Sequence, residues 1–132
     1  MRAVRFHGRG GQGAKTASRI LGTAAFIEGF VAQDSPIYGA ERRGAPVAAF
    51  TRIAKEPIRE RGLIARPDLV VIADASLIHD PAARVLDGIE ERTAVFVNSP
   101  LTPEQFQAQA SLPGCLTTMD LTDIALQQFG KR

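Results

Sequence analysis

The stretch HGRGGQGAKT, from His7 to Thr16, holds the residue types and spacing best suited to chemistry in this sequence. It follows an apolar run and opens a helical pattern. Gly8, Gly10 and Gly13 satisfy the G-x-G-x-x-G dinucleotide fingerprint. A strand followed by a glycine turn and a helix start directs several backbone N–H groups, and the positive end of the helix dipole, at one point. The stretch therefore predicts an anion-binding loop.

The side chains near this loop limit which ligands it could bind but do not identify one. Arg9 and Lys15 add positive charge, and Gln12 supplies a neutral donor. Asp34 lies 21 residues beyond Gly13, where NAD enzymes place the carboxylate that holds a ribose hydroxyl. A phosphate-binding P-loop is a poorer match, because its pattern requires glycine at position 14. Glycines that only permit close packing of a helix on a sheet are the remaining alternative.

A second loop, within QDSPIYGAERRGAPV, places Arg42 and Arg43 between two glycines, with Tyr38 before them and Glu41 beside them. The arginine fork recognises phosphate and carboxylate, and arginine and tyrosine are frequent anchors at protein interfaces. The loop predicts either a phosphate clamp or a docking surface for a partner protein. A solvated surface turn is the alternative.

Strands and helices alternate along the chain. Apolar and β-branched runs predict strands over residues 2–7, 30–35, 47–54, 68–74, 93–99 and 115–120. Helical spacing and capping signals predict helices over residues 13–28, 81–92, 103–110 and 121–130. The polar connection over residues 55–67 allows a hairpin or a short helix. The pattern predicts a single α/β domain with a doubly wound, mostly parallel sheet and helices on both faces.

Details within these elements predict how they pack. The strand over residues 68–74 is nearly all apolar, so we expect it at the centre of the sheet, covered on both faces. Asp80 and Pro81 are the expected N-cap and first residue of the helix over residues 81–92. In the first helix, the residues at core-facing spacing are Ala17, Ile20, Leu21 and Ala24.

Composition limits the class of protein. The chain has 132 residues, 45% of them apolar, which suffices for one core. Residues 1–66 hold 12 basic and 5 acidic side chains, whereas residues 67–132 hold 4 and 9. No apolar run approaches the ~20 residues that cross a bilayer, so we expect a cytoplasmic protein without membrane insertion. Cys115 is the one cysteine, which excludes both an internal disulfide and a four-thiolate iron–sulfur site.

Three stretches together resemble a known family. GRGGQGAKTASRILGTAAF, DSPIYGAERRGAPVAAFTRI and PDLVVIADASLI strongly resemble the gamma subunit, or the equivalent domain, of the pyruvate:ferredoxin and related 2-oxoacid:acceptor oxidoreductases. The resemblance runs from about residue 2 to residue 127. It implies a Rossmann-like module, non-catalytic by itself, in a hetero-oligomer that converts a 2-oxoacid and coenzyme A to acyl-CoA and CO2.

The resemblance also implies where the cofactors and partners lie. Thiamine diphosphate, magnesium and iron–sulfur clusters are expected on partner subunits, with no cofactor held by this chain alone and coenzyme A as co-substrate. The expected partners are the alpha and beta subunits, with a ferredoxin-like delta subunit as a further option, and ferredoxin or another electron acceptor. No nucleic acid partner is expected.

The positions that match the family's motifs are the glycine loop and the loop from Tyr38 to Gly44. We expect coenzyme A to be bound by residues of both loops, namely Gly8, Arg9, Gly10, Gly11, Gln12, Gly13, Tyr38, Arg42 and Arg43. Phosphate contacts by the three arginines are an inference from their chemistry, not part of the motif match.

The chain departs from the family pattern in one respect. Family members continue past the helix over residues 121–130 with another helical segment, so we expect residues 1–132 to be a single gamma-type domain without that C-terminal segment. Two other functions stay open on the sequence alone. One is a free-standing NAD(P)-binding Rossmann oxidoreductase that uses Asp34, and the other is an interaction module whose glycine loop binds nothing.

Overall fold

A six-stranded sheet organises the chain, which the computed structural model describes over residues 1–36 and 43–130. Three α-helices and two short 3₁₀ turns, labelled η, connect its strands. The elements in chain order are β1 (Arg2–Arg9), α1 (Ala14–Ile27), β2 (Val31–Pro36), β3 (Pro46–Ala54), β4 (Leu69–Ile72), η1 (Ala75–His79), η2 (Pro81–Ala83), β5 (Ala94–Asn98), α2 (Pro103–Ala110), β6 (Cys115–Met119) and α3 (Leu121–Phe129).

The strand order is β2-β3-β1-β4-β5-β6. β1, β4, β5 and β6 pair in parallel, whereas β3 runs antiparallel to both of its neighbours, β1 and β2. The predicted mostly parallel sheet is confirmed, with β3 as its one reversed strand. Only residues 37–45 separate β2 from β3, and a parallel crossover needs a dozen or more residues. The short connection therefore requires an antiparallel pair.

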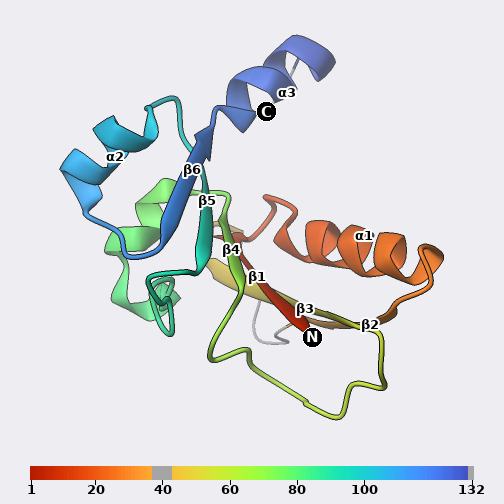
Figure 1. The fold of residues 1–132 in the computed structure, drawn as a ribbon. Coiled ribbons are helices and arrows are strands. Elements are labelled where there is room, and N and C mark those ends of the chain that lie inside the picture. Colours follow the sequence, from red (N-terminus) through yellow and green to blue (C-terminus); the bar gives the residue numbers. More distant parts are fainter. Residues whose placement is uncertain (37–42, 131–132) are drawn as a thin grey trace.

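The two faces of the sheet carry different covers (Figure 1). Helix α1 packs on β1, β2 and β3, and η1, η2 and α2 lie on the opposite side. The expected helices on both faces are thus confirmed. Helix α3 extends away from the carboxyl end of β6 (Figure 1). No helix in the described part of the chain is both long and apolar enough to cross a membrane.

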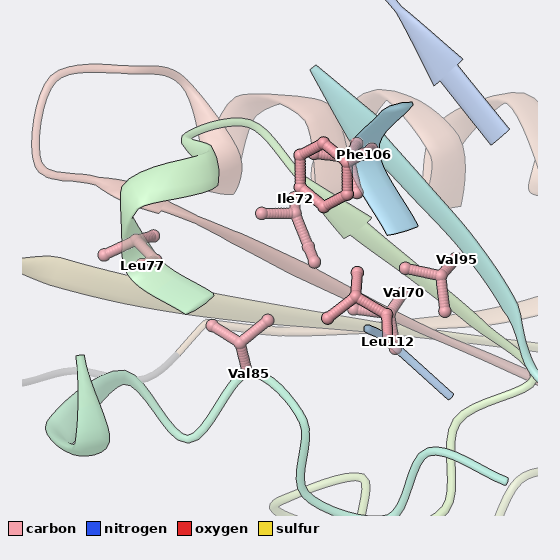
Figure 2. Close-up of a cluster of buried hydrophobic side chains, with 8 residues drawn as sticks. Val70, Ile72, Leu77, Val85, Val95, Phe106 and Leu112 are labelled. Carbon is pink, nitrogen blue, oxygen red and sulfur yellow. The ribbon is translucent and has the colours of Figure 1, made fainter. Parts of the chain in front are cut away.

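The largest apolar core lies on the face opposite α1 (Figure 2). As predicted, β4 is central, and Val70 and Ile72 on this face have no exposed surface. Six further buried apolar side chains from later in the chain belong to the same cluster, namely Leu77, Val85, Val95, Val97, Phe106 and Leu112. This cluster joins η1, β5 and α2 to the middle of the sheet.

The face of helix α1 that packs on the sheet matches the predicted one in part. Ala17 and Leu21 are half-buried and pack against a core cluster that includes Val4 and Phe6, as predicted. The fully buried residues lie one position further along, namely Ser18, Gly22 and Ala25, whereas Ile20 is 63% exposed and Ala24 is exposed. Ser18 is buried despite its hydroxyl because that oxygen lies 2.6 Å from Thr51 Oγ1 on β3. A pattern based on apolar residues alone misses a polar residue whose partner is also buried.

The helix predicted over residues 81–92 is wrong. Asp80 does cap a turn, since its carboxylate accepts a hydrogen bond from Ala82 N, but the 3₁₀ turn η2 ends at Ala83. Arg84 then adopts a left-handed backbone conformation with φ +51°, which no α-helix continues. Gly88 follows with φ +70°, and a Cβ atom there would overlap the Ala65 carbonyl oxygen. Tertiary contacts, rather than helical spacing, fix this segment.

Two buried arginines hold the polar connection over residues 55–67, which forms neither a hairpin nor a helix. Arg5 Nη1 donates to Ile64 O at 3.2 Å, and Arg52 Nη2 donates to Leu63 O at 3.0 Å. Arg5 Nε also donates to His7 Nε2 at 2.9 Å. Burial, and then the charge of Arg5, lower the pKa of His7 to about 4. His7 is therefore neutral at pH 7 and accepts from the guanidinium.

This pair makes the folding stability sensitive to acid. Below the ordinary pKa of 6.5 the unfolded chain protonates His7, but the folded chain does not do so until about pH 4. Stability is therefore lost as the pH falls through this window, by about 2 kcal/mol between pH 6.5 and 5. Urea unfolding near pH 7.5 and near pH 5 measures this loss.

The matched variant is His7→Gln, which keeps an oxygen acceptor for Arg5 but cannot titrate. We expect its loss of stability over the same pH interval to be smaller by about 2 kcal/mol. His79→Gln, which alters an exposed histidine, is the reference. An equal pH dependence in wild type and His7→Gln would contradict this assignment.

Candidate functional site

The glycine loop joins the carboxyl end of β1 to helix α1, as the sequence predicts. Gly11 and Gly13 adopt φ +91° and +87°, a backbone region that side chains other than glycine rarely enter. Gly13 is the N-cap of α1, and glycine has no side chain that could cap the first turn. The helix therefore points its first N–H groups and the positive end of its dipole at this loop.

The loop is tied to the neighbouring strand by a polar cluster around Asp74. Gln12 Oε1 accepts from Arg9 N at 2.7 Å, and Gln12 Nε2 donates to Asp74 Oδ2 at 3.0 Å. The Arg9 guanidinium lies 3.3 Å from the same carboxylate and donates to Ser76 Oγ at 2.9 Å. Arg9 also donates to Gly44 O at 3.1 Å. Arg9 and Gln12 are thus already engaged by groups of this chain.

Asp74 is ionised at neutral pH. Partial burial pushes its pKa upward, but hydrogen bonds from Ser76 and Gln12 and the charge of Arg9 together hold the pKa below the ordinary value. The cluster therefore contains one fixed negative charge beside the loop, and Arg9 neutralises it. An anionic ligand would therefore be attracted by the helix N-terminus and by cations other than Arg9.

The second loop supplies such a cation. Gly10 N donates to Ala45 O at 2.8 Å, Gly44 N donates to Gly10 O at 3.2 Å, and Gly10 forms an isolated bridge with Arg43. The Arg43 side chain passes close to Gly11, with Cγ at 3.9 Å from where a Cβ atom would stand. The two motifs are therefore brought together. Tyr38 and Arg42 lie outside the described residues.

Asp74 and Ser76 are the residues of this cluster that the sequence analysis did not select. Their signal is positional, because they follow the most apolar strand of the chain, β4, at its carboxyl end. β1 and β4 are adjacent and parallel, and the chain leaves them toward opposite edges of the sheet. Such a switch point is where ligands bind in open α/β sheets.

The NAD interpretation based on Asp34 does not match this geometry. β3 lies between β1 and β2, so Asp34 stands one strand further from the glycine loop than in a dinucleotide-binding sheet. The Asp34 carboxylate also accepts a hydrogen bond from Ser18 Oγ at 2.7 Å. Asp34 therefore ties α1 to β2 and is not placed to bind a ribose.

Comparisons with known proteins agree with the motifs. A family model described as pyruvate ferredoxin/flavodoxin oxidoreductase matches residues 3–132. The pyruvate/ketoisovalerate oxidoreductases common subunit gamma of Thermococcus litoralis is 48% identical over 128 residues, which are 96% of this chain and 68% of that protein. This chain thus spans about two thirds of the length of that relative.

Two solved structures share the fold. The pyruvate oxidoreductase subunit PORC of Thermotoga maritima has a TM-score of 0.82 at 38% identity, over 98% of this chain and 67% of that one. The 2-oxoglutarate:ferredoxin oxidoreductase of Magnetococcus marinus, solved with 2-oxoglutarate, coenzyme A and succinyl-CoA, has a TM-score of 0.72. Its identity is 16% over 96% of this chain and 21% of that one, so this likeness concerns the fold alone.

The position of the Asp74 carboxylate beside the loop leads to a testable prediction about anion binding. Asp74→Asn removes the negative charge and leaves Arg9 unneutralised, so we expect inorganic phosphate to bind the loop two- to fivefold more tightly, or about 0.5–1 kcal/mol. Amide NMR shifts of Gly11, Gly13 and Lys15 during a phosphate titration measure this change. Glu104→Gln, on the surface of α2, is the matched control. Unchanged or weaker phosphate binding in Asp74→Asn would show that Asp74 does not oppose anions here.

Proposed function

Because this chain belongs to the pyruvate ferredoxin/flavodoxin oxidoreductase family, we propose that it acts as the gamma subunit of a 2-oxoacid:acceptor oxidoreductase. The observation that carries this proposal is the identity of 48% to a common gamma subunit, over 96% of the chain. The assembled enzyme converts a 2-oxoacid and coenzyme A to acyl-CoA and CO2 and passes the electrons to ferredoxin or another acceptor. The complex works in the cytoplasm.

The chain contributes no redox or decarboxylation centre of its own. Its one cysteine does not fit an iron–sulfur cluster, which needs four thiolates. The described residues contain no group of three histidine, cysteine or acidic side chains that could hold a metal ion. Thiamine diphosphate, magnesium and the clusters belong to alpha, beta and ferredoxin-like delta subunits. This chain is a single gamma-type domain over residues 1–132.

Exposed apolar side chains support a role in assembly. No residue of α3 is buried, and Ile124, Leu126 and Phe129 on it are 43%, 40% and 75% exposed. On α1, Phe26 and Ile27 are 72% and 75% exposed. Apolar surface gathered on two helices is typical of proteins that bury it against a partner. The partner subunits cover these helices in the complex.

The glycine loop and Arg43 form the part of this subunit that receives coenzyme A. The uncapped first turn of α1 and the Arg43 guanidinium are the groups available for phosphate, since Arg9 is paired with Asp74. Coenzyme A carries phosphate groups, and the positive end of a helix binds them without a catalytic side chain. The loop binds and orients coenzyme A, and the chemistry of acyl transfer takes place on the partner subunits.

The subunit role predicts that activity depends on assembly. The purified chain alone is expected to show no 2-oxoacid-dependent reduction of ferredoxin, because it has no group that can decarboxylate the acid or carry the electrons. Co-expression with its partner subunits restores the reaction, and the partners without this chain are the control. Reduction of ferredoxin by the chain alone would overturn the proposal.

The coenzyme A role predicts a selective kinetic effect in the assembled complex. Arg43→Gln removes the cation beside the glycine loop, so the KM for coenzyme A is expected to rise about five- to tenfold, or about 1–1.4 kcal/mol. The KM for the 2-oxoacid stays at the wild-type value.

Two variants control for general effects in this assay. Arg59→Gln removes an exposed arginine outside the site, and Asp34→Ala removes the carboxylate of the NAD interpretation. Both are expected to leave the KM for coenzyme A unchanged. If Arg43→Gln also leaves it unchanged while the complex assembles normally, Arg43 does not contact coenzyme A.

A further inference from the structure

A cavity of about 380 Å³ opens on the sheet face opposite α1. It lies over β1 and β3 and is bounded by residues 63–65 and by the 3₁₀ turn η2. Its walls are mostly apolar, with Val47, Ala48, Phe50, Leu63 and Ile64 among them. Its volume falls within the range of small-ligand sites, which combine apolar walls with a few placed polar groups.

The buried polar groups of this cavity are Arg5 and His7, each only 4% exposed. Arg5 donates to His7 Nε2, to Ile64 O at 3.2 Å and to Val85 O at 2.8 Å. A guanidinium has five N–H donors, so about two remain unused. No carboxylate of the described residues lies within 4.0 Å of Arg5. A buried cation without an anion is costly, and a bound anion relieves that cost.

His7 adds a neutral donor beside this cation. Because Nε2 accepts from Arg5, the ring proton is on Nδ1, which makes no hydrogen bond with the described residues. In the described chain no fully buried side-chain nitrogen or oxygen lacks a partner. Nδ1 is therefore accessible, and His7 lines this cavity. These two buried groups thus offer donors and no free acceptor.

The other charged residues at the cavity neutralise each other. Arg84 Nε lies 2.7 Å from Asp87 Oδ2, and both side chains are largely exposed. The cavity therefore keeps one net positive charge, that of Arg5. A ligand that matches it has a single negative charge with oxygen acceptors and an apolar body.

We propose that this cavity binds a carboxylate attached to a short apolar group. The carboxylate accepts hydrogen bonds from Arg5 and His7, and the apolar group packs against Phe50 and Ile64. A free aliphatic acid or the terminal carboxylate of a peptide chain supplies this chemistry. The cavity lies on the sheet face opposite α1, and its polar groups Arg5 and His7 do not belong to the glycine loop, so this inference does not depend on the coenzyme A role.

Three six-carbon probes test the charge requirement. Hexanoate, hexan-1-ol and hexylamine are titrated separately into the ¹⁵N-labelled chain at pH 7, and the amide shifts of Ala48, Ile64 and Ala82 are followed by NMR. We expect saturable shifts with hexanoate and an affinity at least about tenfold higher than that of hexan-1-ol, or about 1.4 kcal/mol. Hexylamine is expected not to bind.

Two variants locate the site. Arg5→Met is expected to weaken hexanoate binding at least about tenfold, and Arg92→Met, on the surface, is its control. Arg5→Met also removes two hydrogen bonds to backbone carbonyls and could disturb the fold, so a second variant leaves Arg5 and His7 unchanged. Ala82→Phe fills the cavity from its exposed rim and is expected to abolish the shifts, whereas Ala108→Phe on α2 does not.

A final pair of probes separates the two sources of the carboxylate. Acetyl-Ala-Leu with a free terminal carboxylate is compared with its amide. Tighter binding of the peptide acid than of hexanoate supports the site and identifies a chain terminus as the occupant, and the reverse order supports the site with a free acid. The proposal is overturned if neither acid binds, if hexan-1-ol binds as tightly as hexanoate, or if Ala82→Phe binds hexanoate normally.

Discussion

The register of β1 between β3 and β4 is the constraint on which both faces of the molecule depend. Val4 and Phe6 point toward α1 and pack with its small side chains, whereas Arg5 and His7 lie on the opposite face. A shift of one residue would place the Arg5 guanidinium under α1 and remove its carbonyl partners. The alternation of apolar and polar residues in one strand thus specifies the apolar contact with α1 and the polar floor of the cavity together.

The same pairing determines what the glycine loop meets. His7 pairs with Ile72, the last residue of β4, and Ala73 N donates to His7 O at 2.8 Å, so the pairing of β1 with β4 ends there. The glycines from Gly8 onward follow on one strand, and Asp74 follows two residues after Ile72 on the other. A loop that favours anions therefore already has a carboxylate at its side, held by Gln12. In the coenzyme A role that we propose, a phosphate is attracted by the helix N-terminus and Arg43 and repelled by that fixed charge.

Local capping signals predicted helix α2 correctly but failed over residues 81–92. Helix α2 begins and ends at the predicted residues because Thr102 and Gln105 form a capping box and Pro103 starts the helix. The long-range polar contacts were beyond such signals. Arg5 is buried because Val85 O, 80 positions away, accepts from it, and Asp74 reaches Gln12 across 62 positions. No periodicity within a short window contains that information, so the sequence analysis missed both the burial of Arg5 and the part played by Asp74 after β4.

Arg5 and Arg9, both on β1, show why the partners of a charged side chain, rather than its residue type, separate an anchoring role from a binding role. Arg9 Nε lies 3.3 Å from the Asp74 carboxylate, so the Arg9 charge is neutralised within the chain and helps to hold the loop. Arg5 is more deeply buried, yet its hydrogen-bond partners among the described residues are a neutral imidazole and two carbonyl oxygens. Carbonyl dipoles reduce the cost of burying a cation, but a full negative charge reduces it much further. An anionic ligand would therefore gain more from the Arg5 guanidinium than from that of Arg9. The sequence around Arg5, a strand of alternating apolar and polar residues, is that of an ordinary structural position and does not indicate this difference.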